Sequence, residues 1–276
     1  MHEVLISNWI GTSYNLFTHE YDDDYMMTEY VVPDDQRPVF ASHKKAILSG
    51  DVIEVMNYDE PVVYGYKCKY NKGKVKTTNK KRSDNINKSK MTLRRLINAN
   101  VNKFSKFVTL TYRENMQDIS QAKLDFKRFI QRYKRKYNVK LKYVYVIEFQ
   151  KRGAVHFHVV FFNMPFVDVN KLSRIWGHGF VKINRINGVD NVGAYVVKYM
   201  SKDLLDDRLN GRDLYGRSRG LKAPIVITDE KKILALQHKY YINATYSKTY
   251  VSEHFKNITY IQYNLKRCIS KLENLS

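Results

Sequence analysis

The sequence of residues 141–149 is Leu141-Lys-Tyr-Val-Tyr-Val-Ile-Glu-Phe149, and that of residues 155–162 is Val155-His-Phe-His-Val-Val-Phe-Phe162. Both runs are short and rich in β-branched and aromatic residues, which is typical of β-strands. The segment between them contains Lys151-Arg-Gly-Ala154, where the glycine favours a turn. Residues 141–162 therefore predict a β-hairpin.

The flanking sequence predicts further elements on both sides of this hairpin. These are a strand at Lys106–Tyr112, a helix that begins at Asp118 or Ser120 and ends near Tyr137, a helix around Val169–Trp176, a strand at Gly179–Arg185 and a helix from about Asn191 to Leu204. In chain order the elements are β-α-β-β-α-β-α. This order predicts an α+β fold with a ferredoxin-like split βαβ arrangement, in which helices cover one face of an antiparallel central sheet.

The composition is that of a folded, basic protein. The 276 residues are 43% hydrophobic, which is enough to build a core and argues against an intrinsically disordered chain. Cys68 and Cys268 are too far apart in sequence for a disulfide framework or a zinc ribbon, so we expect a reducing, cytoplasmic location. Because no apolar run approaches about 18 residues and the first residues lack the cations of a secretion signal, we expect neither a membrane span nor export.

Charge is distributed unevenly along the chain. The formal net charge is +21, but residues 1–60 contain 12 acidic and 3 basic side chains and carry −9, which leaves +30 on residues 61–276. A basic surface of this size attracts phosphate polyanions, so nucleic acid is the expected partner. The acidic residues could shield that surface or could form a solvated loop.

These patterns predict four segments. Residues 1–60 form an acidic N-terminal region, residues 61–91 a basic linker, residues 92–228 the α+β domain, and residues 229–276 a C-terminal extension without a clear period. The linker is predicted because residues 71–90 are polar, basic and nearly free of apolar side chains.

The predicted hairpin contains a candidate metal site. Alternate residues of a strand point to the same face, so His156 and His158 present two imidazoles side by side. Glu148 lies on the partner strand, where a tight turn brings its carboxylate to the same face. Two imidazoles and one carboxylate accept Mg²⁺, Mn²⁺ or Zn²⁺. The alternative is a pair of buried histidines that only satisfy their hydrogen bonds.

The helix predicted at residues 191–204 contains Tyr-x-x-Lys twice, at Tyr195/Lys198 and at Tyr199/Lys202. At about 100° per residue the two phenols and two ammonium groups share one face, while the Val, Met and Leu residues lie on another. Nearby lysines favour a phenolate and bind phosphate, as a tyrosine nucleophile requires. The alternative is an amphipathic helix with incidental tyrosines, as at Tyr133/Tyr137, where the same spacing continues an apolar stripe.

Together these elements resemble the His-hydrophobic-His (HUH) endonucleases, specifically the rolling-circle replication initiators of bacterial plasmids and single-stranded DNA phages. Three segments are similar to their motifs, in the same order along residues 104–203: Phe107-Val-Thr-Leu-Thr-Tyr112, Gly153-Ala-Val-His-Phe-His158 and Tyr195-Val-Val-Lys-Tyr-Met-Ser-Lys202. The third segment has the two-tyrosine form. Cys68 stands alone here, whereas many relatives have a cysteine cluster upstream of the first motif.

The resemblance implies an enzyme that nicks one strand at a replication origin. Glu148, His156 and His158 would bind Mg²⁺ or Mn²⁺, and Lys198 and Lys202 would position water or phosphate. Tyr195 and Tyr199 would be nucleophiles that form a 5′-phosphotyrosine bond and leave a 3′-OH to prime rolling-circle replication.

The same resemblance implies partners. The substrate would be single-stranded or hairpin DNA at the origin, a host polymerase would extend the 3′-OH, and a host helicase would unwind the duplex, because the chain has no P-loop motif. We predict nucleic-acid contacts from Lys151 and Arg152 in the hairpin turn and from Arg217 and Arg219 in a Gly/Arg-rich loop.

Two other hypotheses remain open from the sequence. One is a non-catalytic nucleic-acid-binding protein, because ferredoxin-like sheets with exposed aromatic residues also bind RNA. The other is an HUH relaxase or transposase. Relaxases usually have a three-histidine motif and a tyrosine near the N-terminus, and such transposases are generally shorter and often have one tyrosine.

Overall fold

The computed structural model describes residues 31–33, 39–68, 79–186, 188–200, 207–209, 213, 215–240, 244–252 and 255–267. The chain divides into two compact units, the first formed by residues before 89 and after 224 and the second by residues 89–224. Lys202 and the acidic stretch Tyr21–Tyr25 lie outside the described residues. None of the helices in the described ranges combines the length and the apolar character that a membrane span requires.

The second unit is built on a five-stranded antiparallel sheet. In spatial order its strands are β8 (Val181–Arg185), β5 (Lys106–Thr111), β7 (Val155–Phe161), β6 (Tyr143–Phe149) and β9 (Tyr215–Arg217). The first four of these are the predicted strands, and their order is fourth, first, third, second along the chain. This is the split βαβ arrangement, so the predicted α+β class is confirmed.

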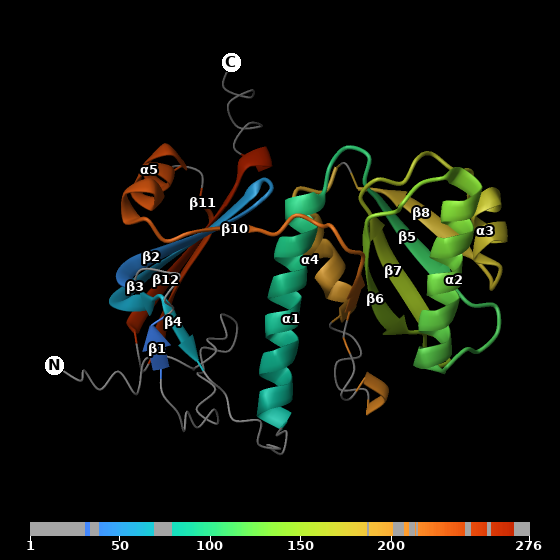
Figure 1. Cartoon of the computed structure of the whole chain (residues 1–276), viewed down its shortest axis with the longest axis horizontal. Helices are drawn as coiled ribbons and strands as arrows, with labels where there is room; N and C mark the ends of the chain where they lie inside the picture. Colours follow the sequence, from blue (N-terminus) through green and yellow to red (C-terminus); the bar gives the residue numbers. More distant parts are fainter. Residues whose placement is uncertain are drawn as a thin grey trace. The chain divides into compact units, whose positions relative to one another are not determined.

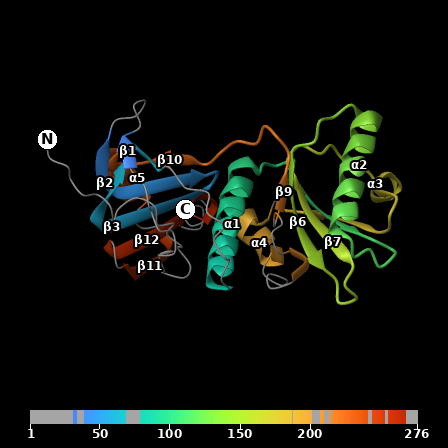
Figure 2. The same ribbon diagram turned by 60° about the horizontal axis from the view of Figure 1, so that its bottom comes forward.

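Helices cover both faces of this sheet, whereas the sequence predicted helices on one face. Figures 1 and 2 show α2 and α3 on one side of the strands and α1 and α4 on the other. These helices are α1 (Asn79–Asn100), α2 (Ile119–Tyr137), α3 (Val169–Trp176) and α4 (Val192–Val197). Two buried clusters result, because the strands carry apolar side chains on both faces.

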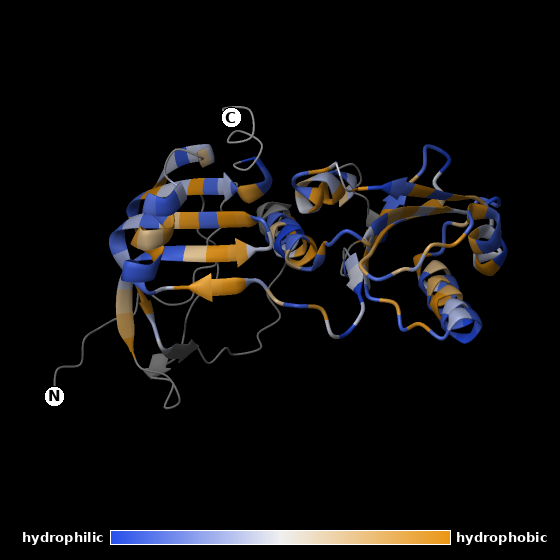
Figure 3. Cartoon of the chain, turned by 90° about the horizontal axis from the view of Figure 1, so that it is seen from above, coloured by the Kyte–Doolittle hydropathy of each residue, from blue (hydrophilic) through white to orange (hydrophobic). Residues whose placement is uncertain are grey.

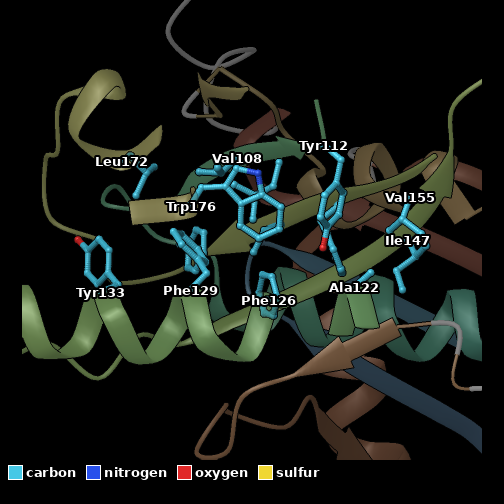
Figure 4. Close-up of a cluster of buried hydrophobic side chains, with 14 of the residues drawn as sticks. Val108, Tyr112, Ala122, Phe126, Phe129, Tyr133, Ile147, Val155, Leu172 and Trp176 are labelled. Atoms are coloured by element: carbon cyan, nitrogen blue, oxygen red, sulfur yellow. The ribbon is translucent and has the colours of Figure 1, made fainter. Parts of the chain in front are cut away.

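The larger cluster lies between the sheet and helices α2 and α3. Figure 4 shows Phe126, Phe129 and Tyr133 of α2 pointing toward the strands, with Trp176 packed beside them. The ring of Trp176 is fully buried and meets Phe129 edge-on at 5.8 Å. Tyr133 is therefore a core residue, as its apolar stripe predicted.

Side-chain caps fix both ends of α2. Asp118, one of the two predicted caps, accepts hydrogen bonds from the backbone N–H groups of Ser120 and Gln121. Asn138 ends the helix in the left-handed conformation, with φ 52°, and its N–H donates to the carbonyl of Lys134.

Helix α4 is held against α1 by a small polar network. The Asn98 side chain donates to Asn191 Oδ1 at 2.9 Å and accepts from the Gly193 N–H at 2.8 Å. Asn191 Oδ1 also accepts from the N–H of Ala194. Val192, Val196 and Met200 are buried in the cluster on this face, so the predicted apolar side of the helix does pack on the sheet. After α4 a 3₁₀ turn, Lys198–Met200, continues the chain.

The first unit contains a second five-stranded antiparallel sheet, along whose strands hydrophobic and hydrophilic residues follow one another (Figure 3). Its order is β10 (Ile225–Ile227), β2 (Phe40–Ser49), β3 (Val52–Tyr64), β12 (Lys256–Asn264) and β11 (Ala244–Ser252). Ile233 of helix α5 (Glu230–Tyr240) packs on it against Ala46 and Val55. The short strands β1 (Val31–Pro33) and β4 (Tyr66–Cys68) pair with each other.

This arrangement differs from the four predicted segments. Strand β3 continues through the boundary expected after residue 60, and residues 79–91 of the expected linker are helical. The expected C-terminal extension, 229–276, supplies β12, which pairs with β3 from Ile258↔Tyr58 to Asn264↔Val52. The physical reason is that pairing between distant segments, and packing of one apolar face of α1, outweigh local composition.

We expect Gly193→Ala to destabilise the second unit. A Cβ atom there would overlap the backbone carbonyl oxygen of Arg94 in α1, so α4 must shift, at a cost of roughly 1–3 kcal/mol. Urea unfolding followed by Trp176 fluorescence in a Trp9→Phe background would measure this. Gly188→Ala is the matched control, because a Cβ at Gly188 meets nothing within 4 Å. Equal stability of the two variants would contradict the close approach of α4 and α1.

Candidate metal and tyrosine site

The β6–β7 hairpin brings the three predicted metal ligands together. Glu148 of β6 lies directly opposite His156 of β7, and His158 follows two residues later on the same face. One ligand atom from each residue lies within 4.8 Å of those of the others. Glu148 and His158 are buried and His156 is partly buried. The short turn and the antiparallel register therefore produce the arrangement that the sequence predicted.

The orientation of these side chains suits a cation. Nε2 of His158 is 2.5 Å from Oε2 of Glu148, and Nδ1 of His156 is 4.0 Å from the same oxygen. Two imidazole nitrogens and one carboxylate oxygen, turned toward one point, form a donor set for a divalent ion such as Mg²⁺, Mn²⁺ or Zn²⁺. These three residues could therefore hold a metal ion, and their chemistry does not choose between these ions.

Two threonines of β5 stand behind the histidines, and the sequence analysis did not identify them as site residues. Thr111 pairs with His156 and Thr109 with His158 in the ladder between β5 and β7. The Oγ1 of Thr111 is 2.8 Å from Nε2 of His156, which leaves Nδ1 of that ring facing Glu148. Thr109 Oγ1 is 3.5 Å from Nδ1 of His158. Hydrogen bonds of this kind orient imidazole ligands. The alternation Thr109-Leu-Thr111 was the available signal.

Both tyrosines of the third motif reach this site from α4 and the turn after it. The ring of Tyr199 stacks on the imidazole of His158, with centroids 3.9 Å apart and an interplanar angle of 25°. The hydroxyl of Tyr195 is 3.0 Å from that of Tyr199. Phe107 of β5 lies beneath, 5.5 Å from each phenol ring and 5.6 Å from His158. The phenols and the carboxylate–imidazole group therefore meet over one patch of the sheet.

The surroundings of Tyr199 favour the neutral phenol. Burial raises the pKa of Tyr199 to about 12, and the hydrogen bond with Tyr195 and the nearby charges of Tyr195 and Glu148 act in the same direction. The sequence analysis expected the opposite influence, from lysines within one turn. Lys198 is exposed, and Lys202 lies outside the described residues.

The basic residues predicted to bind nucleic acid occupy three kinds of position. Lys151 is exposed in the hairpin turn. The Arg152 guanidinium donates to the backbone carbonyls of Arg113 and Tyr112, so it ties the turn to the end of β5. Arg217 and Arg219 are exposed near the β9 edge of the sheet.

His178, which the sequence analysis left out of the site, lies on the other face of the sheet. Its ring packs against Tyr112 and Trp176, and its Nε2 is 3.9 Å from the buried Asp125 of α2. Tyr133 and Tyr137, which share the four-residue spacing, also belong to the cluster on that face. Of these two pairs of tyrosines, the later one reaches the histidines of the hairpin.

Comparison with known proteins gives one match. Residues 105–204 match the sequence model of the family described as replication-associated protein ORF2 (gene 2 protein). No curated protein and no solved structure matches the chain. The matched range includes β5, the hairpin with Glu148, His156 and His158, and both Tyr195 and Tyr199. Residues 105–204 of this chain therefore form a domain of a replication-associated protein (Rep) family, a family of replication initiators.

Proposed function

We propose that this protein is a metal-dependent endonuclease and strand transferase that nicks one DNA strand at a replication origin through a tyrosine nucleophile. The observation that carries the proposal is the stacking of Tyr199 on His158, with the Tyr195 hydroxyl within hydrogen-bond distance of the Tyr199 hydroxyl. A phenol beside a carboxylate–imidazole cation site is the arrangement needed to attack a phosphodiester. The replication-associated family supports a role in the initiation of replication.

The metal site and the tyrosines divide the work. A divalent cation held by Glu148, His156 and His158 would neutralise negative charge on the scissile phosphate. Thr111 and Thr109 would keep the two imidazoles turned toward that point. The stacked rings of Phe107, His158 and Tyr199 would hold the attacking oxygen in place, which removes much of the entropy cost of the reaction.

The proposed step conserves atoms and charge. The phenolic oxygen forms a bond to phosphorus, and the bond from phosphorus to the 3′ oxygen breaks, with its electron pair remaining on that oxygen. The phenol releases its proton and the 3′ oxygen takes one up, so the products are a 5′-phosphotyrosine ester and a free 3′-OH. Because the ester keeps the bond energy, the second tyrosine can attack in turn after a host helicase and polymerase have completed a round of synthesis.

Replacing the tyrosines should abolish the covalent adduct. Incubation of the protein and Mn²⁺ with a pool of single-stranded oligonucleotides should give adducts on denaturing gels, which mass spectrometry would map to Tyr195 or Tyr199. Each single Phe variant removes one nucleophile, and Tyr195→Phe/Tyr199→Phe removes both, so the double variant should give none.

The matched control is Tyr133→Phe, from the pair with the same spacing in α2. Its hydroxyl is buried and has no hydrogen-bond partner among the described residues, so this variant should stay folded and form adducts at the wild-type level. Adducts from the double tyrosine variant would refute the proposed nucleophiles and leave a binding protein as the better hypothesis.

Thr111→Val should weaken metal binding although Thr111 is not itself a ligand. Loss of the hydroxyl next to Nε2 releases the His156 ring, and loss of such a hydrogen bond lowers metal affinity by about 10–100-fold. Isothermal titration of Mn²⁺ into the protein would measure this, with His158→Ala as the variant expected to lose binding altogether.

Thr249→Val is the matched control for this titration. Thr249 is also a strand threonine and lies 3.0 Å from the Thr259 hydroxyl in the first unit, so its replacement should leave Mn²⁺ affinity unchanged. Equal affinities of the Thr111 and Thr249 variants would show that the threonine does not orient the ligand.

A further inference from the structure

Phe180 is a large apolar side chain left in solvent at the edge of the five-stranded sheet of the second unit. It lies immediately before β8, and 69% of its surface is exposed. Full burial of such a side chain contributes about 1.5–3 kcal/mol, so its exposure forgoes a substantial stabilisation. A single exposed aromatic residue is common on protein surfaces, and the case for a function depends on how it is held.

The backbone that carries Phe180 is tightly held. A Cβ atom on Gly179 would overlap the backbone carbonyl oxygen of Thr111, so only glycine allows this approach to β5. The N–H of Thr111 donates to the Phe180 carbonyl at 2.9 Å, and Ser173 Oγ donates to the Gly179 carbonyl at the same distance. The indole of Trp176 adds a hydrogen bond to the Thr111 carbonyl. The exposed ring therefore stands on a fixed support.

The strand register places Phe180 on the face that carries the metal site. Val181 pairs with Leu110 and packs in the cluster with α2 and α3, so the preceding side chain projects to the opposite face. Phe180 continues the ladder opposite Thr111, whose hydroxyl contacts His156. With strands roughly 4.8 Å apart, Phe180 lies two strands, about 10 Å, from His156.

An exposed cation accompanies the ring. Lys182 pairs with Thr109, and Thr109 pairs with His158, so Lys182 projects from the same face one row further along the strand. The Lys182 side chain is exposed. An aromatic ring next to a cation on one strand is a pattern that binds single-stranded nucleic acid, by stacking on a base and pairing with the adjoining phosphate.

We infer that Phe180 and Lys182 form a nucleotide subsite, in which a base of single-stranded DNA next to the scissile phosphate stacks on Phe180 while its phosphate contacts Lys182. The inference rests on the proposed function, because it names a second contact with the same DNA strand. It adds a base-binding platform on β8 to a site otherwise built from β5, β6, β7 and α4. Stacking accepts every base, so the subsite fixes the position of the strand rather than its sequence.

The test measures binding apart from cleavage. Fluorescence anisotropy with labelled (dT)20, in EDTA to prevent nicking, should show that Phe180→Ala weakens binding by about 5- to 150-fold. Phe180→Trp should restore it. Phe166→Ala is the matched control, because Phe166 is 87% exposed and follows the far end of β7, so it should bind like the wild type.

An abasic 20-mer separates stacking from other effects. Without bases there is nothing to stack, so Phe180→Ala and the wild type should bind this strand equally. A loss smaller than about fivefold on (dT)20, or an equal loss on both strands, overturns the inference. Because no step of this measurement needs catalysis, the subsite and the nicking activity can fail independently.

The salt dependence tests Lys182. For single strands the slope of log affinity against log salt falls by about 0.7 for each phosphate that a cation of the protein no longer neutralises, so Lys182→Ala should flatten the slope by that amount. Lys171→Ala, an exposed lysine of α3 on the other face, is the control. Equal slopes for the two variants overturn the assignment of Lys182.

Discussion

The register of three antiparallel strands, β5, β7 and β6, is the constraint on which the site depends. It places Thr111, His156 and Glu148 in one row across the sheet and Thr109 and His158 in the next. A shift by one residue would turn both histidines toward the cluster under α2 and α3 and would expose Phe157 and Val159 instead. The apolar residues between the histidines therefore fix the position of the ligands, because burying them on the far face allows only this pairing.

The second requirement is that α4 delivers two phenols to the same patch. Burying polar side chains such as Glu148 and His158 is costly unless they are paired, and here the carboxylate lies against the imidazole while Phe107 and Tyr199 cover the ring. The network of Asn98, Asn191 and Gly193 sets the helix at the depth where this stacking is possible. Close packing between α1 and α4 thus determines the geometry of the tyrosines, although α1 contributes none of the predicted site residues.

Local patterns were sufficient to predict the strands, the helices α2 and α3, and the alignment of Glu148 with His156, because each depends on periodicity or on a tight turn. Helix α1 was missed because residues 79–90 contain little apolar character, and its packing rests on Leu93, Leu96 and Ile97. The pairing of β12 with β3 joins residues about 200 positions apart, which no local pattern indicates. Thr109 and Thr111 acquire their role only from the neighbouring strand.

The two tyrosines are not equivalent, and the reason lies in their shared hydrogen bond. Between two phenols at 3.0 Å only one hydroxyl can donate to the other, so the pair holds one internal proton and leaves a second available to solvent or substrate. Tyr199 stacks on His158 and lies close enough to Glu148 for the carboxylate to raise its pKa, whereas Tyr195 meets Phe107 edge-on from the preceding turn of α4. Any positive charge brought to the hairpin would reverse the influence of Glu148 on Tyr199 first. The geometry therefore makes the ionisation of one phenol depend on the metal site directly and that of the other depend on it through its partner, which is an asymmetry that an alternation between two nucleophiles can use.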